Sequence, residues 1–147
     1  QHPEIPALSH YVPAHEGPED ELAKTFPLQL ITWKGKNRAN STQYANPWLI
    51  EAQQQKLWIN PRDAQKRGIT QGDTVRIHNA RGICEIPAEV TPRIIPGVVA
   101  MQAGAWWQPD EKGIDKGGCA NVLSSARITA LAKGNSHQTM LVEVAKA

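Results

Sequence analysis

The sequence predicts a mainly β fold: a small closed barrel of about six short strands with one or two short helices. Apolar residues alternate over several segments of four to eight residues, as they do in half-buried strands. The 147 residues include 11 glycines and 11 prolines, and many of these lie between the alternating segments, where they mark turns. Short strands joined by frequent turns favour closure into a barrel, because closure leaves no exposed strand edge.

The chain is expected to begin with an arm and to continue as a single domain. Residues 1–25 carry four prolines and several charges with little periodicity, so we expect an extended arm that lies across another surface or is disordered when that surface is absent. The remaining residues, 26–147, are long enough for one domain with its own core and too short for two ordinary ones. With neither a basic segment nor an apolar segment at its start, the chain also reads as a piece excised from a larger protein.

The expected strands follow from alternation and from apolar runs. Leu28 and Leu30 share one face of the first strand, and Met140, Val142 and Val144 share one face of the last. The run VVAM has no polar residue and is expected to be buried on both faces. In chain order, the expected strands cover residues 26–32, 57–59, 74–79, 83–90, 98–101 and 139–144.

One helix is signalled clearly, in the centre of the chain. Asn60 is a favourable N-cap and Pro61 suits the first helical position, where a missing N–H costs nothing. Gly68 is suited to the left-handed residue that ends a helix, so this helix has two turns at most. Residues 53–55, three glutamines, are expected to form a turn or a short helix end, and residues 124–133 fit either a helix or a turn.

Composition narrows the classes of function. Sixteen Lys and Arg against 14 Asp and Glu give a net charge of +2, which argues against a dedicated nucleic-acid or membrane-surface protein. No apolar run approaches the roughly 20 residues needed to cross a bilayer, so direct membrane insertion is not expected. The two cysteines lack metal-ligand spacing, and Cys84 alternates with apolar residues as a core residue would.

Motifs for covalent chemistry are missing from the sequence. The five histidines show no helical pairing, and there is neither a G-x-S-x-G elbow nor a glycine-rich phosphate motif. The segment WKGKNRANSTQYAN, residues 33–46, is instead polar, basic and long for a connection inside a compact domain. Its Lys and Arg suit phosphate oxygens, its amides suit the edges of a heterocycle, and Trp33 suits stacking.

Plainer interpretations of the same residues remain open. The basic segment is also what a solvated loop looks like, and the pair Trp106 and Trp107 is typical of packing. A nucleic-acid-binding barrel would use Trp33 to stack a base and Lys34, Lys36 and Arg38 on the backbone, although the low net charge counts against it. A protein-recognition module would use exposed tryptophans as anchors.

Several segments in the same order resemble one known family. They are RANS after the first strand, INPRDAQKRGITQGDTVRIHNARG in the middle, VTPRIIPGVVAMQAGAWW, then GGCANVL and SHQTMLVEV. Together they make residues 26–146 similar to the C-terminal molybdopterin-dinucleotide-binding domain of the dimethyl sulfoxide reductase superfamily. The arm sequence YVPAHEGPED most resembles the catalytic subunits of bacterial dimethyl sulfoxide reductases.

The resemblance implies a six-stranded double-psi β-barrel with long cofactor-facing loops, the last domain of a larger catalytic subunit. It implies binding of bis-molybdopterin guanine dinucleotide, with the molybdenum ligand and any iron–sulfur cluster upstream. The cofactor-binding residues that it implies are Thr32, Trp33, Lys34, Gly35, Arg38, Asn40, Ser41, Thr42, Asn121, Gln138 and Thr139. No residue of this chain is expected to be catalytic or to bind a metal.

For the parent enzyme, the resemblance implies reduction of dimethyl sulfoxide or related S- or N-oxides in anaerobic respiration. Its expected partners are the upstream domains, an iron–sulfur electron-transfer subunit and a membrane anchor subunit, with no nucleic acid. The expected location is the periplasm, with membrane association through the partner subunits.

Overall fold

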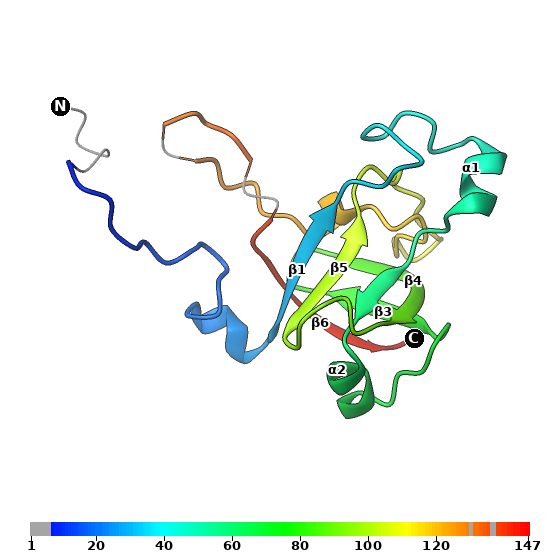
Figure 1. The fold of residues 1–147 in the computed structure, drawn as a ribbon, viewed down its shortest axis with the longest axis horizontal. Coiled ribbons are helices and arrows are strands. Elements are labelled where there is room, and N and C mark those ends of the chain that lie inside the picture. The colour runs from blue at the N-terminus through cyan, green and yellow to red at the C-terminus, as the bar shows by residue number, and fades with distance from the viewer. Residues whose placement is uncertain (1–6, 130, 136–137) are drawn as a thin grey trace.

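The computed structural model describes residues 7–129, 131–135 and 138–147. Six strands close into a barrel in the order β1-β5-β2-β4-β3-β6 (Figure 1). The strands are β1 (Leu28–Trp33), β2 (Leu57–Ile59), β3 (Thr74–His78), β4 (Ile83–Val90), β5 (Val98–Gln102) and β6 (Met140–Lys146). The helices are α1 (Pro47–Ala52) and α2 (Pro61–Lys66), with 3-10 turns η1 (Glu21–Lys24) and η2 (Ala120–Val122).

The strand pairing confirms the predicted mainly β barrel. Strand β1 runs parallel to β5, and β2 runs parallel to β4, whereas the remaining neighbours are antiparallel. Parallel neighbours require connections that cross the barrel, as expected for the double-psi fold. Strand β6 pairs with β1 through its first residues and with β3 through its last, and so closes the barrel.

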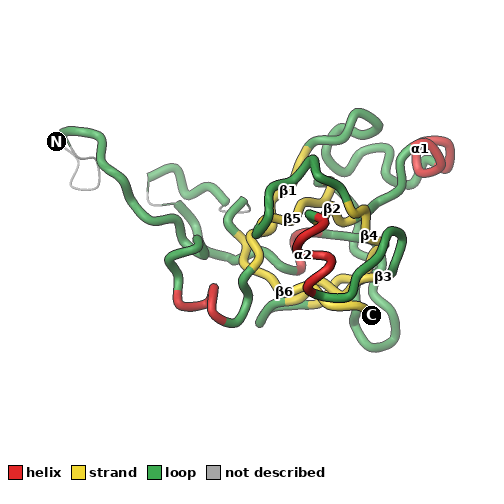
Figure 2. The backbone as a smooth tube through the Cα atoms, turned by 60° about the horizontal axis from the view of Figure 1, so that its bottom comes forward, coloured by secondary structure: helices red, strands yellow, loops and turns green. Residues whose placement is uncertain are grey.

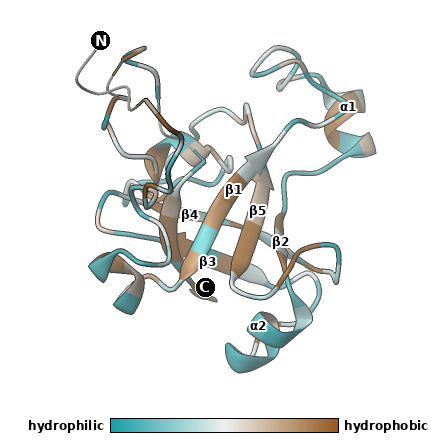
Figure 3. Ribbon diagram, turned by 60° about the vertical axis from the view of Figure 1, so that its left-hand side comes forward, coloured by the Kyte–Doolittle hydropathy of each residue, from teal (hydrophilic) through white to brown (hydrophobic). Residues whose placement is uncertain are grey.

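The barrel interior is a single apolar core. Figure 3 shows the hydrophobic residues concentrated on the strands, whereas α2 is mostly hydrophilic. The core side chains with no exposed surface are Leu30, Leu57, Ile59, Val75, Ile77, Cys84, Ala88, Val99, Met101, Leu123 and Val142. Cys84 is therefore a packing residue, as predicted, and burial raises the pKa of its thiol.

The capping signals of the central helix are confirmed. The Asn60 side chain accepts a hydrogen bond from the Arg62 N–H at 2.9 Å, and its amide donates to the Ile94 carbonyl at 2.7 Å. Gly68 follows the helix with φ of 63°, in the left-handed region. Figure 2 shows α2 lying across one end of the barrel, and the loops that follow β1 and β5 lie at the other end (Figure 1).

Strand ends differ from the predicted ones by one or two residues. Strand β1 begins at Leu28 rather than at residue 26, and Pro27 just before it has no N–H with which to extend a ladder. The stretch left open between helix and turn contains neither a helix nor a strand over residues 124–129 and 131–133, apart from a bridge from Ile128 to Asn135. Among the described residues, no helix has the length and apolar character required to cross a membrane.

The arm differs from the expected extended segment. Residues 14–25 turn back on themselves and include η1, and Glu16 and Gly17 are buried. Glu16 pairs with Arg81 on the barrel, with 2.8 Å between the guanidinium and the carboxylate. The sequence alone does not distinguish Glu16 from the other charged residues of the arm, because its partner lies 65 positions away.

A carboxylate near the C-terminal strand should titrate far below its ordinary range. The N–H of Thr70, the Lys146 ammonium and the Thr70 hydroxyl all bond one Asp73 oxygen, and they lower the pKa of Asp73 from 3.8 to about 2. The stabilisation from this group is therefore complete above pH 3.8 and is lost as the pH falls towards 2. Carboxyl carbon shifts followed by NMR measure this pKa directly. In Lys146→Ala it should rise only partway, because the Thr70 bonds remain, whereas an unchanged value would contradict the role of Lys146.

Candidate functional site

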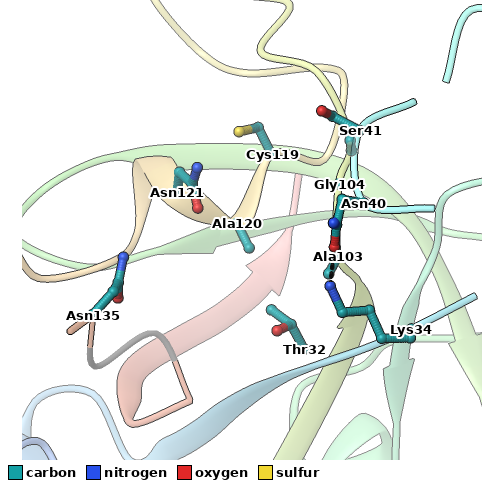
Figure 4. A pocket seen from close by; sticks show the side chains of 11 residues that line it. Thr32, Lys34, Asn40, Ser41, Ala103, Gly104, Cys119, Ala120, Asn121 and Asn135 are labelled. Atoms are coloured by element: carbon teal, nitrogen blue, oxygen red, sulfur yellow. Dashed lines mark hydrogen bonds between the residues drawn. The ribbon is translucent and has the colours of Figure 1, made fainter. Parts of the chain in front are cut away.

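A cavity of about 230 Å³ opens at the end of the barrel opposite α2. Four separate segments form its wall, and none of them is adjacent to another in sequence (Figure 4). The lining residues are Thr32, Lys34, Asn40, Ser41, Ala103, Gly104, Ala105, Cys119, Ala120, Asn121 and Asn135. The cavity therefore exists only in the folded chain.

The loop after β1 supplies the polar wall. Strand alternation places Thr32 and Lys34 on the cavity side, and the Lys34 ammonium donates a hydrogen bond to the Asn40 amide oxygen. Asn40 adopts a positive φ of 54°, which asparagine tolerates better than most residues. The loop thus presents an ammonium, an amide and the Ser41 hydroxyl to the same space.

The segment after β5 lies unusually close to this loop. Gly104 has φ of 89°, and a Cβ atom built on it would lie 1.8 Å from the Asn40 carbonyl oxygen. Only glycine permits this approach. The indole N–H of Trp106 then donates to the Ser41 carbonyl at 2.9 Å, and the Trp106 ring stacks on Tyr44, so Trp106 packs against the loop.

A buried carboxylate shapes the third segment. Asp115 has no exposed surface and accepts hydrogen bonds from three backbone N–H groups, those of Gln108, Gly117 and Cys119. These bonds position the chain that enters η2, where Asn121 faces the cavity. Burial raises the pKa of the Cys119 thiol, so this thiol stays protonated and is a poor nucleophile.

Arg38 does not line the cavity. It is only 9% exposed, and its Nη2 donates to the side-chain oxygens of Gln55 at 3.2 Å and Gln102 at 3.1 Å. Its guanidinium also lies 5.0 Å from the centre of the Tyr44 ring, and its Nη1 is buried without a hydrogen-bond partner among the described residues. These contacts indicate that Arg38 stabilises the conformation of the loop after β1.

Three more of the predicted residues also lie off the cavity wall. Trp33 points away from Thr32 and packs on Trp58, with ring centres 5.0 Å apart, and both tryptophans line a different cavity. Gly35 is pressed against Gln102, since a Cβ there would lie 1.6 Å from its side-chain nitrogen. The Thr42 hydroxyl donates to the Ala39 carbonyl at 2.5 Å within the loop.

The segment before β6 contacts a residue of the cavity wall through the Gln138 side chain. The Gln138 side chain accepts from the Thr32 N–H at 2.9 Å and donates to the Thr32 hydroxyl at 2.8 Å. Thr139 is half-buried and does not line the cavity. Gln138 therefore holds Thr32 in place at the cavity, whereas Thr139, the next residue, does not line it.

Of the predicted set, the structure gathers Thr32, Lys34, Asn40, Ser41 and Asn121 around one cavity. Sequence reasoning missed the lining residues Ala103, Gly104, Ala105, Cys119, Ala120 and Asn135. The run of small residues AGA directly after β5 was a usable signal, because small residues permit close approach. Asn135 gave none.

The chemistry of the wall is that of a binding site. Its described residues combine one ammonium with hydroxyl and amide groups, and no carboxylate is among them. Across residues 7–129, 131–135 and 138–147, no cluster of His, Cys, Asp and Glu is arranged to hold a metal ion. Such a wall can donate hydrogen bonds to an anionic or carbonyl-rich ligand.

These features define the chain as a barrel domain with a polar cavity between its loops. Residues 28–141 match the family described as the Molydopterin dinucleotide binding domain. The chain belongs to this family.

Relatives and one solved structure agree with this assignment. The chain is 52% identical to dimethyl sulfoxide reductase DmsA of Escherichia coli K12 over 97% of its length, and 40% identical to a trimethylamine-N-oxide reductase of Haemophilus influenzae over 85%. It spans only 17% and 16% of those proteins. The structure of acetylene hydratase from Pelobacter acetylenicus superposes with a TM-score of 0.70 at 17% identity, covering 86% of this chain and 19% of that one, which shows a shared fold.

Proposed function

We propose that this chain is the cofactor-binding domain of a molybdenum oxidoreductase and holds part of a bis-molybdopterin guanine dinucleotide. The carrying observation is the cavity in which Lys34, Ser41 and Asn121 converge from separate loops. Residues from separate loops meet this way where a rigid frame presents a binding site. Family membership supplies the class of ligand.

The donor set fits such a ligand. The Lys34 ammonium suits a phosphate oxygen, and the amides of Asn121 and Asn135 suit the edge of a heterocycle. The cavity of about 230 Å³ is smaller than the roughly 300 Å³ at which ligand pockets begin, so this chain provides one wall of a larger site. When bound, the molybdenum–pterin group supplies the redox chemistry, and the residues of this chain bind and orient it.

For the parent protein, we propose reduction of dimethyl sulfoxide or a related S- or N-oxide in anaerobic respiration. Two relatives, a dimethyl sulfoxide reductase and a trimethylamine-N-oxide reductase, support this substrate class. The proposed partners are upstream domains of the same subunit, an iron–sulfur subunit and a membrane anchor subunit, in the periplasm. An iron–sulfur cluster, if the parent has one, belongs to the upstream part.

Replacing Asn121 with alanine tests the cavity assignment in the longer protein. The Asn121 side chain is exposed and makes no hydrogen bond to another described residue, so the isolated chain should lose no more than about 0.5 kcal/mol of stability. Removing a hydrogen bond to the cofactor inside the assembled site should instead cost about 1–3 kcal/mol of cofactor binding. Cofactor released per protein after denaturation, measured by fluorescence of the oxidised pterin, gives the result.

Gln65→Ala is the matched control, because Gln65 is an exposed amide on α2 at the other end of the barrel. It should leave cofactor content unchanged. Equal cofactor content in wild type and Asn121→Ala would contradict the assignment. A sharp loss of stability in the isolated Asn121→Ala chain would make Asn121 a structural residue instead.

A further inference from the structure

The arm contributes a buried carboxylate to the barrel. Glu16 is 1% exposed, and both of its oxygens accept from the Arg81 guanidinium, Nη1 to Oε1 and Nη2 to Oε2, each at 2.8 Å. This two-bond geometry is the strongest form of the arginine–carboxylate pair. The carboxylate is buried whereas the Arg81 side chain is 31% exposed, so removing Arg81 would leave Glu16 buried without its two-bond partner. The pair therefore fixes the two chain segments relative to each other.

Arg81 also holds the wall of the cavity. Its Nε and Nη2 donate to the Leu123 carbonyl at 2.9 and 2.7 Å, and the Asn79 amide donates to the same oxygen at 2.8 Å. Leu123 is the C-cap of η2, the turn that carries Asn121. The 79–82 turn therefore fixes the end of η2.

Close packing adds to these bonds. A Cβ atom on Gly82 would lie 2.6 Å from the Val122 carbonyl oxygen, so the 79–82 turn lies directly against η2. The turn η2 has only three residues and no side-chain cap. A helix this short is not stable alone, and its position depends on what it packs against.

Glu16 reaches the other side of the cavity as well. Its Oε2 accepts from the Leu141 N–H at 3.1 Å, and the Asn79 amide donates to the Leu141 carbonyl at 3.2 Å. Leu141 lies in the part of β6 that pairs with β1 and precedes the part that pairs with β3. The Glu16 carboxylate thus satisfies an N–H of β6 three residues after Gln138, which holds Thr32 at the cavity.

We propose that Glu16 is a positioning residue, through which the chain preceding the barrel sets the geometry of the cofactor cavity. One carboxylate joins the arm to η2 through Arg81 and to β6 through the Leu141 N–H. Displacing the arm therefore shifts Asn121 and the Gln138–Thr32 pair, which lie on different walls. This inference rests on the proposed function for the identity of the ligand, and the structural coupling stands without it.

The test compares Glu16→Gln with Glu21→Gln in this chain. Both changes remove one negative charge from the arm, but Glu21 is exposed and, within the part of the chain that the structure describes, its ion pair is with Lys24 in η1 alone. Without ligand, Glu16→Gln should shift the backbone NMR signals of Asn121, Leu123 and Thr32 and speed hydrogen exchange at the Leu141 N–H. Glu21→Gln should change none of these signals.

Titration with guanosine diphosphate gives the functional readout. Glu16→Gln should bind the nucleotide at least about fivefold more weakly than wild type, the lower range of ordinary coupling between sites. Glu21→Gln should match wild type. Arg81→Lys keeps the charge but loses the fork and its paired bonds to the Leu123 carbonyl, so it should also shift the Leu123 signal and give an affinity between those of wild type and Glu16→Gln.

The outcomes separate the two proposals. If wild type shows no response to the nucleotide, the ligand assignment fails, and the signal shifts of Glu16→Gln alone decide the coupling. If wild type and Glu16→Gln bind equally, with unchanged signals at Asn121 and Thr32, Glu16 only anchors the arm and the inference is overturned. Should Glu16→Gln not fold, Arg81→Lys decides by the same readouts.

Discussion

Gly104→Ala should destabilise the chain by about 3 kcal/mol, because two penalties act at one position. With φ of 89°, an L side chain is strained there, and its Cβ would lie 1.8 Å from the Asn40 carbonyl oxygen. The loop after β1 must therefore move away from the segment after β5, which also opens the cavity. Urea denaturation of the purified variant measures the loss.

Gly113→Ala is the control for the backbone penalty alone. Gly113 has φ of 78°, and nothing lies within 4 Å of a Cβ built on it. The Gly113→Ala variant should lose only about 1–2 kcal/mol of folding stability. Equal losses in the two variants would mean that the contact between Gly104 and Asn40 does not constrain the loop.

Arg38→Ala should destabilise the chain by about 3 kcal/mol as well. The guanidinium bridges Gln55 and Gln102 and lies over Tyr44, whose hydroxyl donates to the Gly117 carbonyl at 2.9 Å. Hydrogen bonds to a charged group contribute about 1.5–3 kcal/mol each, and deletion also removes the donor from the buried amide oxygen of Gln102 and the half-buried one of Gln55. Part of this loss of stability is offset because the variant no longer buries a cation. The cost of that burial is visible in the pKa of Arg38, which desolvation lowers.

Arg62→Ala, at an exposed position on α2, is the matched control and should change stability by no more than about 0.5 kcal/mol.

The Arg38→Ala variant also decides between two roles for Arg38. A supporting role predicts a large loss of stability. A phosphate-binding role predicts unchanged stability with weaker nucleotide binding, and that result would contradict the placement of Arg38 described here.

Local signals in the sequence were sufficient for much of the fold. Asn60, Pro61 and Gly68 mark the ends of α2 through their own backbone preferences, so no distant partner is needed to interpret them. The strands follow from alternation for the same reason. Their order around the barrel does not, because parallel pairs such as β1 and β5 join segments that are far apart in the chain, and the resemblance to a family supplied that topology.

The site was predictable in outline and not in detail. The loop after β1 was singled out and does supply part of the cavity wall, but alternation sends Trp33 to the side opposite Thr32, and Arg38 turns inward towards Gln102. The direction of a side chain in a long loop depends on contacts with distant segments, which a single sequence does not reveal. Glu16 was missed for the same reason, since only folding brings it to Arg81.

A guanine nucleotide should occupy the cavity between the loop after β1 and η2. Isotope-filtered nuclear Overhauser measurements on the chain with guanosine diphosphate examine this placement, because they report which protein protons lie beside the ligand. We expect contacts from the guanine and ribose protons to the methyl groups of Thr32, Ala103 and Ala120, with binding as weak as millimolar because one wall acts alone. Contacts to Trp33 and Trp58 instead, or shifts spread evenly over lysines and arginines and abolished by modest salt, would contradict it.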